Sequence, residues 1–413
     1  MLILNIIQIV LLILLGLATL YILIFSIASL FYKQQHYSDN GNIKRMAVLV
    51  PGYKEDEVII EVATLALEQE YPTPLFDVVI IADSFKERTL TSLKKLPIKL
   101  IEVSFDKSTK SKALNKAMAT LDKDYDIAVV LDADNVMAPD FLAKINAAFE
   151  NDFIAVQGHR IAKNTNNSWA ILDAISEEIN NNIFRKGHRV LGLSSAIIGS
   201  GMAFRYGYFK SLMATVTAVG GFDKEIELKM LKEGRKIVYL EDAVVFDEKI
   251  QKSEVFVNQR RRWLSAQFHY FRKDFLNALK DLVLKGNVDY FDKTIQFIQP
   301  PRILLLGAVI LFSIGFILAN YFLDNQIPYS NYWIILVIAC VLSFVFSVPR
   351  SFYNLRTLKA LKKLPKGMLM MSLCLLKIKG ANKTFIHTHH TSNSEEVSSK
   401  KFIKIPQSRI NEI

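Results

Sequence analysis

The first 32 residues form a stretch without a single charged side chain. No Asp, Glu, Lys or Arg occurs between Met1 and Tyr32, and Lys33 ends the run. About 20 apolar residues are enough for a helix to cross the hydrocarbon core of a bilayer. A secretory signal would have a basic start, a shorter apolar core and a small-residue cleavage site. We therefore predict a retained transmembrane helix over residues 1–32.

Two more uncharged stretches follow late in the chain, at residues 303–323 and 331–349. Each is long enough to span a bilayer, so residues 302–349 are predicted to form two transmembrane helices. The link between them has one acid and no Lys or Arg, and the positive-inside rule therefore places it outside and residues 33–301 in the cytoplasm. We expect an integral protein of a bacterial inner membrane, with its catalytic domain cytoplasmic.

The net charge of +11 is concentrated at the C-terminus. Residues 350–413 hold 13 Lys and Arg against three acids, a surplus of ten. Basic residues beside a membrane span are typical of contact with anionic lipid. We expect the lipid bilayer as a partner and no nucleic acid, and we predict a cytoplasmic tail with an interfacial segment at 366–380. Cys340 and Cys374 lie in apolar stretches, which indicates neither a disulfide framework nor a zinc site.

Between the membrane segments, short apolar runs alternate with helical patterns. The runs cover residues 46–51, 77–83, 98–103 and 127–134. Continuous apolar runs of this length are typical of parallel strands that are buried on both faces. Their alternation with helices predicts an α/β domain over residues 45–265, built on an open, doubly wound sheet. Residues 266–301 mix aromatic residues with Lys and Asp, which predicts interfacial helices.

Three of the four runs end in acidic or turn-forming residues. These ends are Pro51-Gly52-Tyr53, Asp83-Ser84 and Asp132-Ala133-Asp134. Ligands of doubly wound sheets bind outside the carboxyl ends of the strands. Carboxylates that converge there suit a hard divalent cation, which takes oxygen ligands and bridges phosphates. A single D-x-D also occurs often in turns and caps, but its place directly after an apolar run favours a binding site.

Seven short motifs follow one another along the chain. They are "VPGYKED", "IADS", "KSKALN", "LDADN", "GSGMAFR", "GGFDKEIELKMLKEG" and "QRRRW". In order and rough spacing they resemble the family 2 glycosyltransferases, most of all the membrane-bound, processive hyaluronan, chitin, cellulose and poly-N-acetylglucosamine synthases. The resemblance covers about residues 45–265. It implies a glycosyltransferase A-type fold with a mixed, nucleotide-sugar-binding sheet, flanked by N- and C-terminal transmembrane helices.

The resemblance also implies roles for the matching residues. The nucleotide of a UDP-sugar would contact strand-end residues and one arginine, namely Pro51, Tyr53, Glu55, Asp83, Lys110, Asp132 and Arg262. A glycan acceptor would contact small, amide and aromatic residues, namely Gly201, Met202, Gln259 and Trp263. Asp134 would bind Mg²⁺ or Mn²⁺, which neutralises the charge that develops on a leaving nucleoside diphosphate. Taken alone, "QRRRW" also fits a basic-aromatic membrane anchor, with Arg260 and Arg261 as lipid contacts.

An inverting transfer needs a base that deprotonates the acceptor hydroxyl. In the family this base is the Asp of a Glu-Asp pair that opens a helix, and a glycine ends the helix eleven residues later. Counting back from Gly234 leads to Asp223, so the acids of "LED", Glu241 and Asp242, are predicted not to be catalytic.

Phe222 takes the place of the usual Glu in that pair, and this departure leaves alternatives for the base. Asp223 could act only as a helix cap, a position that Asp favours. Glu225 or Glu227 could then be the base. The pair Glu177-Glu178, in the helical pattern 168–187, is predicted to face solvent rather than to hold a second metal ion.

The predicted reaction is the processive synthesis of a β-linked polysaccharide from a UDP-sugar. One alternative is a single addition to a lipid or a short glycan. A second alternative, favoured by the missing Glu before Asp223, is an inactive nucleotide-sugar sensor or assembly subunit. Because three spans make a self-contained polymer channel doubtful, secretion of a polymer would need a partner or an oligomer.

Overall fold

The computed structural model describes residues 1–38, 40–121, 124–249, 253–323 and 327–376. The predicted basic tail therefore lies, from residue 377 onward, outside the described residues, and so does the end of the predicted interfacial segment. The described part of that segment, residues 366–376, belongs to a helix, α15 (Leu364–Leu376).

Eight described strands form one mixed sheet in the order β3-β2-β1-β4-β7-β6-β8-β5. They are β1 (Met46–Tyr53), β2 (Phe76–Asp83), β3 (Lys99–Val103), β4 (Ile127–Val130), β5 (Val136–Met137), β6 (Ala155–Ala162), β7 (Met202–Arg205) and β8 (Ile237–Asp247). The first four strands are parallel to one another, whereas β7 and β5 run antiparallel to their neighbours. The prediction of a mixed α/β sheet is confirmed.

Helices cover both faces of the sheet and explain the continuous apolar runs. In β1, Val48 and Val50 pack into one core cluster, while Ala47 and Leu49 pack into the cluster on the opposite face. Both faces of the strand are thus buried, so alternation with polar residues is lost. One cluster includes residues of α2 (Ile59–Ala66) and α5 (Phe141–Phe149). The other includes residues of α4 (Lys110–Thr120), α8 (Tyr206–Met213) and α9 (Phe222–Lys232). A short helix, α3 (Glu87–Leu93), links β2 and β3.

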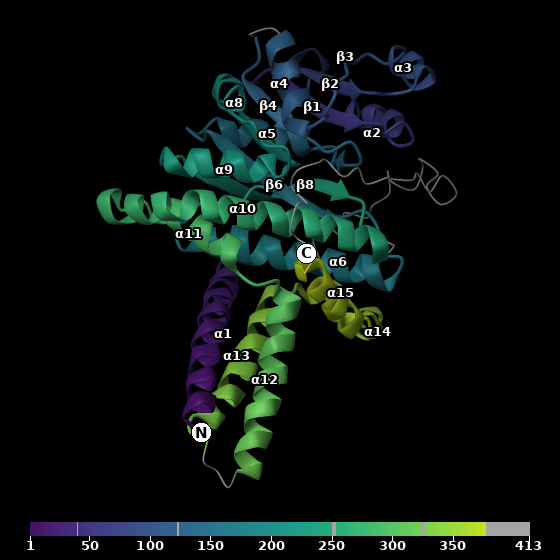
Figure 1. Cartoon of the computed structure of the whole chain (residues 1–413). Helices are drawn as coiled ribbons and strands as arrows, with labels where there is room; N and C mark the ends of the chain where they lie inside the picture. The colour runs from purple at the N-terminus through teal and green to yellow at the C-terminus, as the bar shows by residue number, and fades with distance from the viewer. Residues whose placement is uncertain (39, 122–123, 250–252, 324–326, 377–413) are drawn as a thin grey trace.

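Among the described residues, three helices are long and apolar enough to cross a membrane. They are α1 (Leu2–Ser29), α12 (Arg302–Phe322) and α13 (Ser330–Ser347). Figure 1 shows them as a bundle that extends away from the sheet. The bundle is packed by apolar and aromatic side chains, with Trp333 fully buried and stacked on Phe316 at 5.1 Å between ring centroids.

A layer of helices lies between the sheet and this bundle (Figure 1). It contains α6 (Ser168–Asn181), α10 (Ser253–Lys285) and α11 (Val288–Ile298). The predicted domain boundary after residue 265 falls inside α10, which is a single helix. In its second half, α10 exposes Leu276, Val283 and Leu284. Exposed apolar side chains next to charged ones are typical of helices at a membrane surface.

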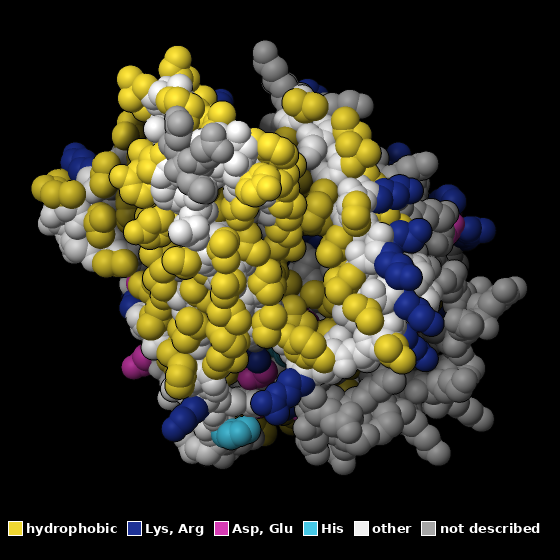
Figure 2. All heavy atoms as spheres, turned by 90° about the horizontal axis from the view of Figure 1, so that it is seen from below, with side chains coloured by type: hydrophobic (Ala, Val, Ile, Leu, Met, Phe, Trp, Pro, Cys, Tyr) yellow, Lys and Arg dark blue, Asp and Glu magenta, His cyan; other side chains and the backbone are white. Residues whose placement is uncertain are grey.

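Two short helices, α14 (Leu355–Leu361) and α15, follow α13 in the chain. Residues 350–376 contain no Asp or Glu and six exposed cations, which are Arg350, Arg356, Lys359, Lys362, Lys363 and Lys366. Figure 2 shows hydrophobic side chains over the spanning bundle and Lys and Arg beside it. This arrangement fits contact with anionic lipid.

Helix α1 docks on a π-helical segment, η2 (Asn182–Gly187), which continues α6 and leads into α7 (His188–Val190). The Phe25 ring stacks on His188 with 3.7 Å between centroids. A Cβ atom at Gly187 would overlap with the backbone oxygen of Phe25. The absence of a side chain at Gly187 therefore permits this close helix crossing.

We predict that Gly187→Ala destabilises the protein by about 1–3 kcal/mol, because the added methyl group must push α1 away from η2. Thermal unfolding of the purified protein in detergent measures the effect. Gly315→Ala is the matched control, since a Cβ at this helical glycine would meet nothing within 4 Å. Equal melting temperatures for the two variants would contradict the prediction.

Candidate active site

A cavity of about 850 Å³ lies at the carboxyl ends of β1, β2 and β4 and extends to α6, α9, α10 and α11. It brings together most of the residues that the sequence predicted. Those on its wall are Pro51, Tyr53, Glu55, Asp83, Lys110, Asp132, Asp134, Asp223, Gln259, Arg262 and Trp263. Gly201 and Met202 are not on its wall.

Directly after each of the first two strands, one residue adopts a left-handed backbone conformation. Lys54 follows β1 with φ 56°, and Ser84 follows β2 with φ 61°. The Lys54 backbone N–H donates to the Asp83 backbone oxygen at 3.1 Å, which joins the two turns. The buried Asp83 carboxylate accepts a hydrogen bond from Ser84 Oγ at 2.9 Å. Both strands thus turn away at the cavity and leave Asp83 on its wall.

Lys110 connects three parts of the cavity wall. It opens α4 directly after the capping residue Thr109. Its ammonium group donates to the Asp132 carboxylate and, at 2.7 Å, to the backbone oxygen of Gly199. The same group lies 5.0 Å from the centre of the Phe222 ring. A cation is therefore fixed beside the D-x-D motif.

Asp134 and Asp247 are linked by one amide group. Asn135 Nδ2 donates to Asp134 Oδ1 at 3.2 Å and to Asp247 Oδ1 at 2.9 Å. Within the described ranges, no group of three or more His, Cys, Asp or Glu is arranged to hold a metal ion. Mg²⁺ commonly takes only one or two carboxylates and completes its shell with water and substrate phosphates. The buried carboxylate of Asp134 on the cavity wall fits that mode of binding.

Asp223 lies in the first turn of α9, and Gly221 with φ +68° is the N-cap. Asp223 therefore does not occupy the cap position, which argues against the alternative that it only caps the helix. Its carboxylate lies 3.5 Å from Lys224 Nζ. The free N–H groups of a first helical turn favour a negative charge at this place. Gly234, with φ +71°, follows the end of this helix. The count of eleven residues back from Gly234 to Asp223 assumed this position of the glycine.

The other acids of α9 have different surroundings. Glu225 is not on the cavity wall and pairs with Lys229 at 3.0 Å. Glu227 is on the wall, but it forms a buried ion pair with Lys293 of α11 at 2.7 Å. Burial raises the pKa of Glu227 and lowers the pKa of Lys293, while their mutual attraction opposes both shifts. Asp223 is thus the acid of α9 that lies on the cavity wall outside this buried pair.

The acids of "LED" lie elsewhere. Glu241 pairs with Lys186, and Asp242 lies 4.0 Å from His36. Neither is on the cavity wall. This placement is in line with the prediction that they do not belong to the site.

Gln259, Arg262 and Trp263 lie within one turn of α10, at spacings that put them on one helix face. Burial lowers the pKa of Arg262, although Asp132 and Asp223 act in the opposite direction. Arg260 donates to Asp173 at 2.6 Å and stacks 4.6 Å from the Trp263 ring centre. The charge of Arg260 is therefore paired with α6, which argues against the alternative that Arg260 serves as a lipid contact.

Two acceptor residues are placed differently from the prediction. Met202 is fully buried in the core on one face of the sheet. The backbone oxygen of Gly201 accepts from the Gly158 N–H at 2.7 Å, next to the core. The turn that reaches the cavity comes earlier, at Ile198 and Gly199. Because Met202 is the first residue of β7, its side chain follows the alternation of that strand into the core.

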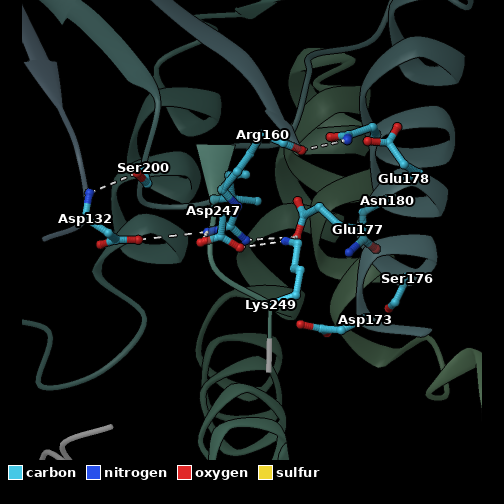
Figure 3. A network of polar contacts seen from close by, with 12 residues as sticks. Asp132, Arg160, Asp173, Ser176, Glu177, Glu178, Asn180, Ser200, Asp247 and Lys249 are labelled. Carbon is cyan, nitrogen blue, oxygen red and sulfur yellow. Dashed lines mark hydrogen bonds and ion pairs between the residues drawn. The ribbon is translucent and has the colours of Figure 1, made fainter. Parts of the chain in front are cut away.

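Sequence reasoning missed a buried group of charged residues on the cavity wall (Figure 3). It joins Arg160 of β6, Glu177 of α6, and Asp247 and Lys249 at the end of β8. Arg160 Nη2 donates to Glu177 Oε2 at 2.9 Å, and Lys249 Nζ donates to Asp247 Oδ2 at 2.6 Å. The prediction that Glu177 and Glu178 face solvent is wrong, because both side chains are buried. The only available signal was the place of Asp247 after the apolar run "AVVF".

The family is decided by the sequence itself. The sequence model described as "Glycosyltransferase like family 2" matches residues 44–266, more than half of the chain. The chain belongs to glycosyltransferase family 2. It is therefore a transferase. The matched region of this glycosyltransferase contains the sheet and extends into the first part of α10.

Similar proteins are known for part of this glycosyltransferase. Two relatives, from Trichormus variabilis and a Nostoc species, are named β-monoglucosyldiacylglycerol synthase. Each is 23% identical over 281 residues, which is 64% of this chain and 57% of the relative. The chain thus spans less than two thirds of the length of these relatives.

A solved structure shares the fold. It is a mannosyltransferase from Pyrobaculum calidifontis in complex with GDP-Man and Mn²⁺, with a TM-score of 0.50 and 18% identity. The match covers 83% of this chain and 98% of the mannosyltransferase. The predicted glycosyltransferase A-type fold is confirmed.

We predict that Glu177→Gln destabilises the protein at neutral pH by about 3–5 kcal/mol, because it leaves buried cations without their counter-charge. Burial opposes ionisation of Glu177, but Arg160, Lys249 and Arg185 outweigh burial and lower its pKa far below 4.5. An acid with a lowered pKa contributes stability above its unfolded-state pKa, and that stability is lost as the pH falls. The difference between wild type and variant should therefore be constant from pH 7 to about 4.5 and shrink below.

Thermal unfolding across this pH range measures the prediction. Glu102→Gln is the control, because Glu102 forms an exposed ion pair with Lys94. Exposed pairs contribute about 0–1 kcal/mol. A Glu177→Gln variant as stable as this control at pH 7 would refute the prediction.

Proposed function

We propose that this glycosyltransferase transfers a sugar, with inversion, from a UDP-sugar to an acceptor at the cytoplasmic face of a bacterial inner membrane. The observation that supports the proposal is the shared cavity of Asp83, Asp132, Asp134, Asp223 and Trp263. Exposed cations follow α13, whereas the link between α12 and α13 has one acid and no Lys or Arg. Because Lys and Arg are enriched on the cytoplasmic side of a membrane, this difference supports a cytoplasmic catalytic domain.

The residues at the strand ends suit the nucleotide diphosphate. Under this proposal Tyr53, Glu55 and Asp83 contact the nucleoside, while Lys110 and Arg262 bring positive charge to the diphosphate. Asp134 would hold Mg²⁺ or Mn²⁺, which supplies charge neutralisation for the leaving diphosphate. An arginine fork binds phosphate oxygens in pairs, so Arg262 also orients the donor.

Asp223 is the proposed base. Its carboxylate takes the proton from the acceptor hydroxyl as the hydroxyl oxygen bonds to the anomeric carbon and the bond to the diphosphate breaks. Gln259 and Trp263 offer the acceptor an amide and a flat apolar ring on the same helix face. Phe222, which replaces the usual Glu, is apolar and therefore adds no charge beside Asp223.

A lipid-anchored acceptor is our first candidate. The cavity reaches Lys293, Gln296 and Phe297 of α11, in the helix layer next to the spanning bundle. An acceptor head group could therefore enter the cavity while its lipid chains remain in the bilayer. The names of the two relatives, which are glucosyldiacylglycerol synthases, are in line with such an acceptor.

A growing β-linked polysaccharide is the second candidate, supported by Gln259, Arg262 and Trp263 at the cavity, as in the motif of processive synthases. Passage of a polymer would then require a secretion partner or an oligomer, because apolar side chains fill the described bundle. Sizing the product on membranes separates the candidates. A single added sugar on a lipid supports the first, and a long ladder of products supports the second.

We predict that Asp223→Asn lowers turnover by about 10²–10⁴-fold, because the base is lost. UDP binding should remain unchanged, since the nucleotide contacts stay in place. The measurements are UDP release from a panel of UDP- and GDP-sugars with Mn²⁺ or Mg²⁺, and UDP affinity by calorimetry.

Asp242→Asn is the control for this experiment, because Asp242 lies outside the cavity. It should keep the wild-type rate. Wild-type turnover in Asp223→Asn would assign the base to another group, and no nucleotide release from any sugar by the wild type would overturn the proposed function.

A further inference from the structure

Arg160 is a buried cation of the cavity wall that none of the recognised motifs contains. Its Nη1 atom lies 3.9 Å from Asp132 Oδ2 and 3.8 Å from Asp247 Oδ1, too far for hydrogen bonds. Asp132 belongs to the D-x-D motif, and Asn135 joins Asp247 to Asp134. Arg160 therefore points toward Asp132 and Asp247 (Figure 3). Asn135 links Asp247 to the proposed metal ligand Asp134.

The guanidinium group of Arg160 is held at one end and has spare donors at the other. Arginine has five N–H donors. Among the described residues, one hydrogen bond of this side chain is formed, from Nη2 to Glu177 Oε2 at 2.9 Å, and the buried Nε atom has no partner. Lys249 pairs with Asp247 and lies 3.8 Å from Glu177. Glu177 is thus the fixed support of a guanidinium whose remaining donors are available to a ligand.

The guanidinium group of Arg160 stays protonated although it is buried. Burial disfavours the charged guanidinium, but Asp247, Glu177 and Asp132 outweigh burial and raise its pKa. A buried group with several unused N–H donors costs free energy unless a partner arrives. Phosphate oxygens are the ligands that match an arginine fork best, because they accept two parallel hydrogen bonds.

We propose that Arg160 binds the diphosphate of the donor nucleotide, opposite Lys110, and that Glu177 is the positioning residue that holds it there. The two cations lie on the same carboxylate, Asp132, since Lys110 donates to Oδ1 and Arg160 approaches Oδ2. A diphosphate that enters between them would take up the spare donors of Arg160. This inference rests on the proposed function, because it assumes a nucleoside diphosphate in the cavity.

The test compares ligands that differ only in their phosphates. The affinities of uridine, UMP and UDP for the purified full chain are measured by calorimetry in detergent with Mn²⁺. The double variant Arg160→Gln/Glu177→Gln removes the guanidinium together with its counter-charge, which avoids an unpaired buried carboxylate. Arg160→Lys keeps the positive charge but loses the fork. Arg205→Gln is the matched control, because Arg205 donates to the backbone oxygens of Phe153 and Asn151, away from the cavity.

We expect the double variant to bind UDP about 10–100-fold more weakly, the loss typical of a charge-assisted hydrogen bond. Uridine affinity should stay unchanged, Arg160→Lys should show a smaller loss for UDP, and Arg205→Gln should show none. An unchanged ratio of UDP to uridine affinity in both Arg160 variants would overturn the inference, and so would an equal loss for uridine and UDP. A wild-type chain that does not bind UDP would instead overturn the proposed function.

Discussion

The crowding of carboxylates at one edge of the sheet is the constraint on which the rest of the structure depends. Asp83 and Asp132 come from neighbouring parts of the sheet, and Asp223 and Asp247 join them in one cavity. Like charges at close range in a poorly solvated place are unfavourable unless cations offset them. The cations come from other elements, with Lys110 on α4, Arg160 on β6 and Arg262 on α10. The negative charge of the carboxylates is therefore offset only when all three of these elements are in place.

Helix α6 links the carboxylate group of the cavity to the bundle of long apolar helices. On one side its Asp173 and Glu177 pair with Arg260 and Arg160. On the other side, Asn182 Nδ2 in the π-helical segment donates to the Ser347 backbone oxygen of α13 at 2.7 Å. π-Helical segments inside α-helices occur frequently at functional sites. α6 and the π-helical segment that continues it therefore contact both Arg160 and α13.

The sequence could predict the sheet and much of the candidate site because both follow from local patterns. A continuous apolar run indicates a parallel strand, and the acid after it, such as Asp83 or Asp134, then lies at the ligand-binding edge. The partners of Glu177 could not be predicted in this way. An acid pair on an amphipathic helix is typical of a solvated face, and Arg160 and Lys249 reach Glu177 only through tertiary packing. The same holds for Met202, whose orientation depends on where β7 begins.

The part of the cavity wall formed by α11 differs in origin from the part that holds the acids. The matched family region ends at residue 266, within α10, whereas Lys293, Gln296 and Phe297 of α11 complete the cavity wall. Lys293 donates to Gln296 Oε1 at 3.0 Å and pairs with Glu227, so α11 is joined to the helix of Asp223. Gln296 in turn donates to Asp292, which accepts from Tyr21 of α1. Under the proposed function, the choice of acceptor therefore depends on residues beyond the family motifs, in α11 and in the apolar helix α1 that contacts it.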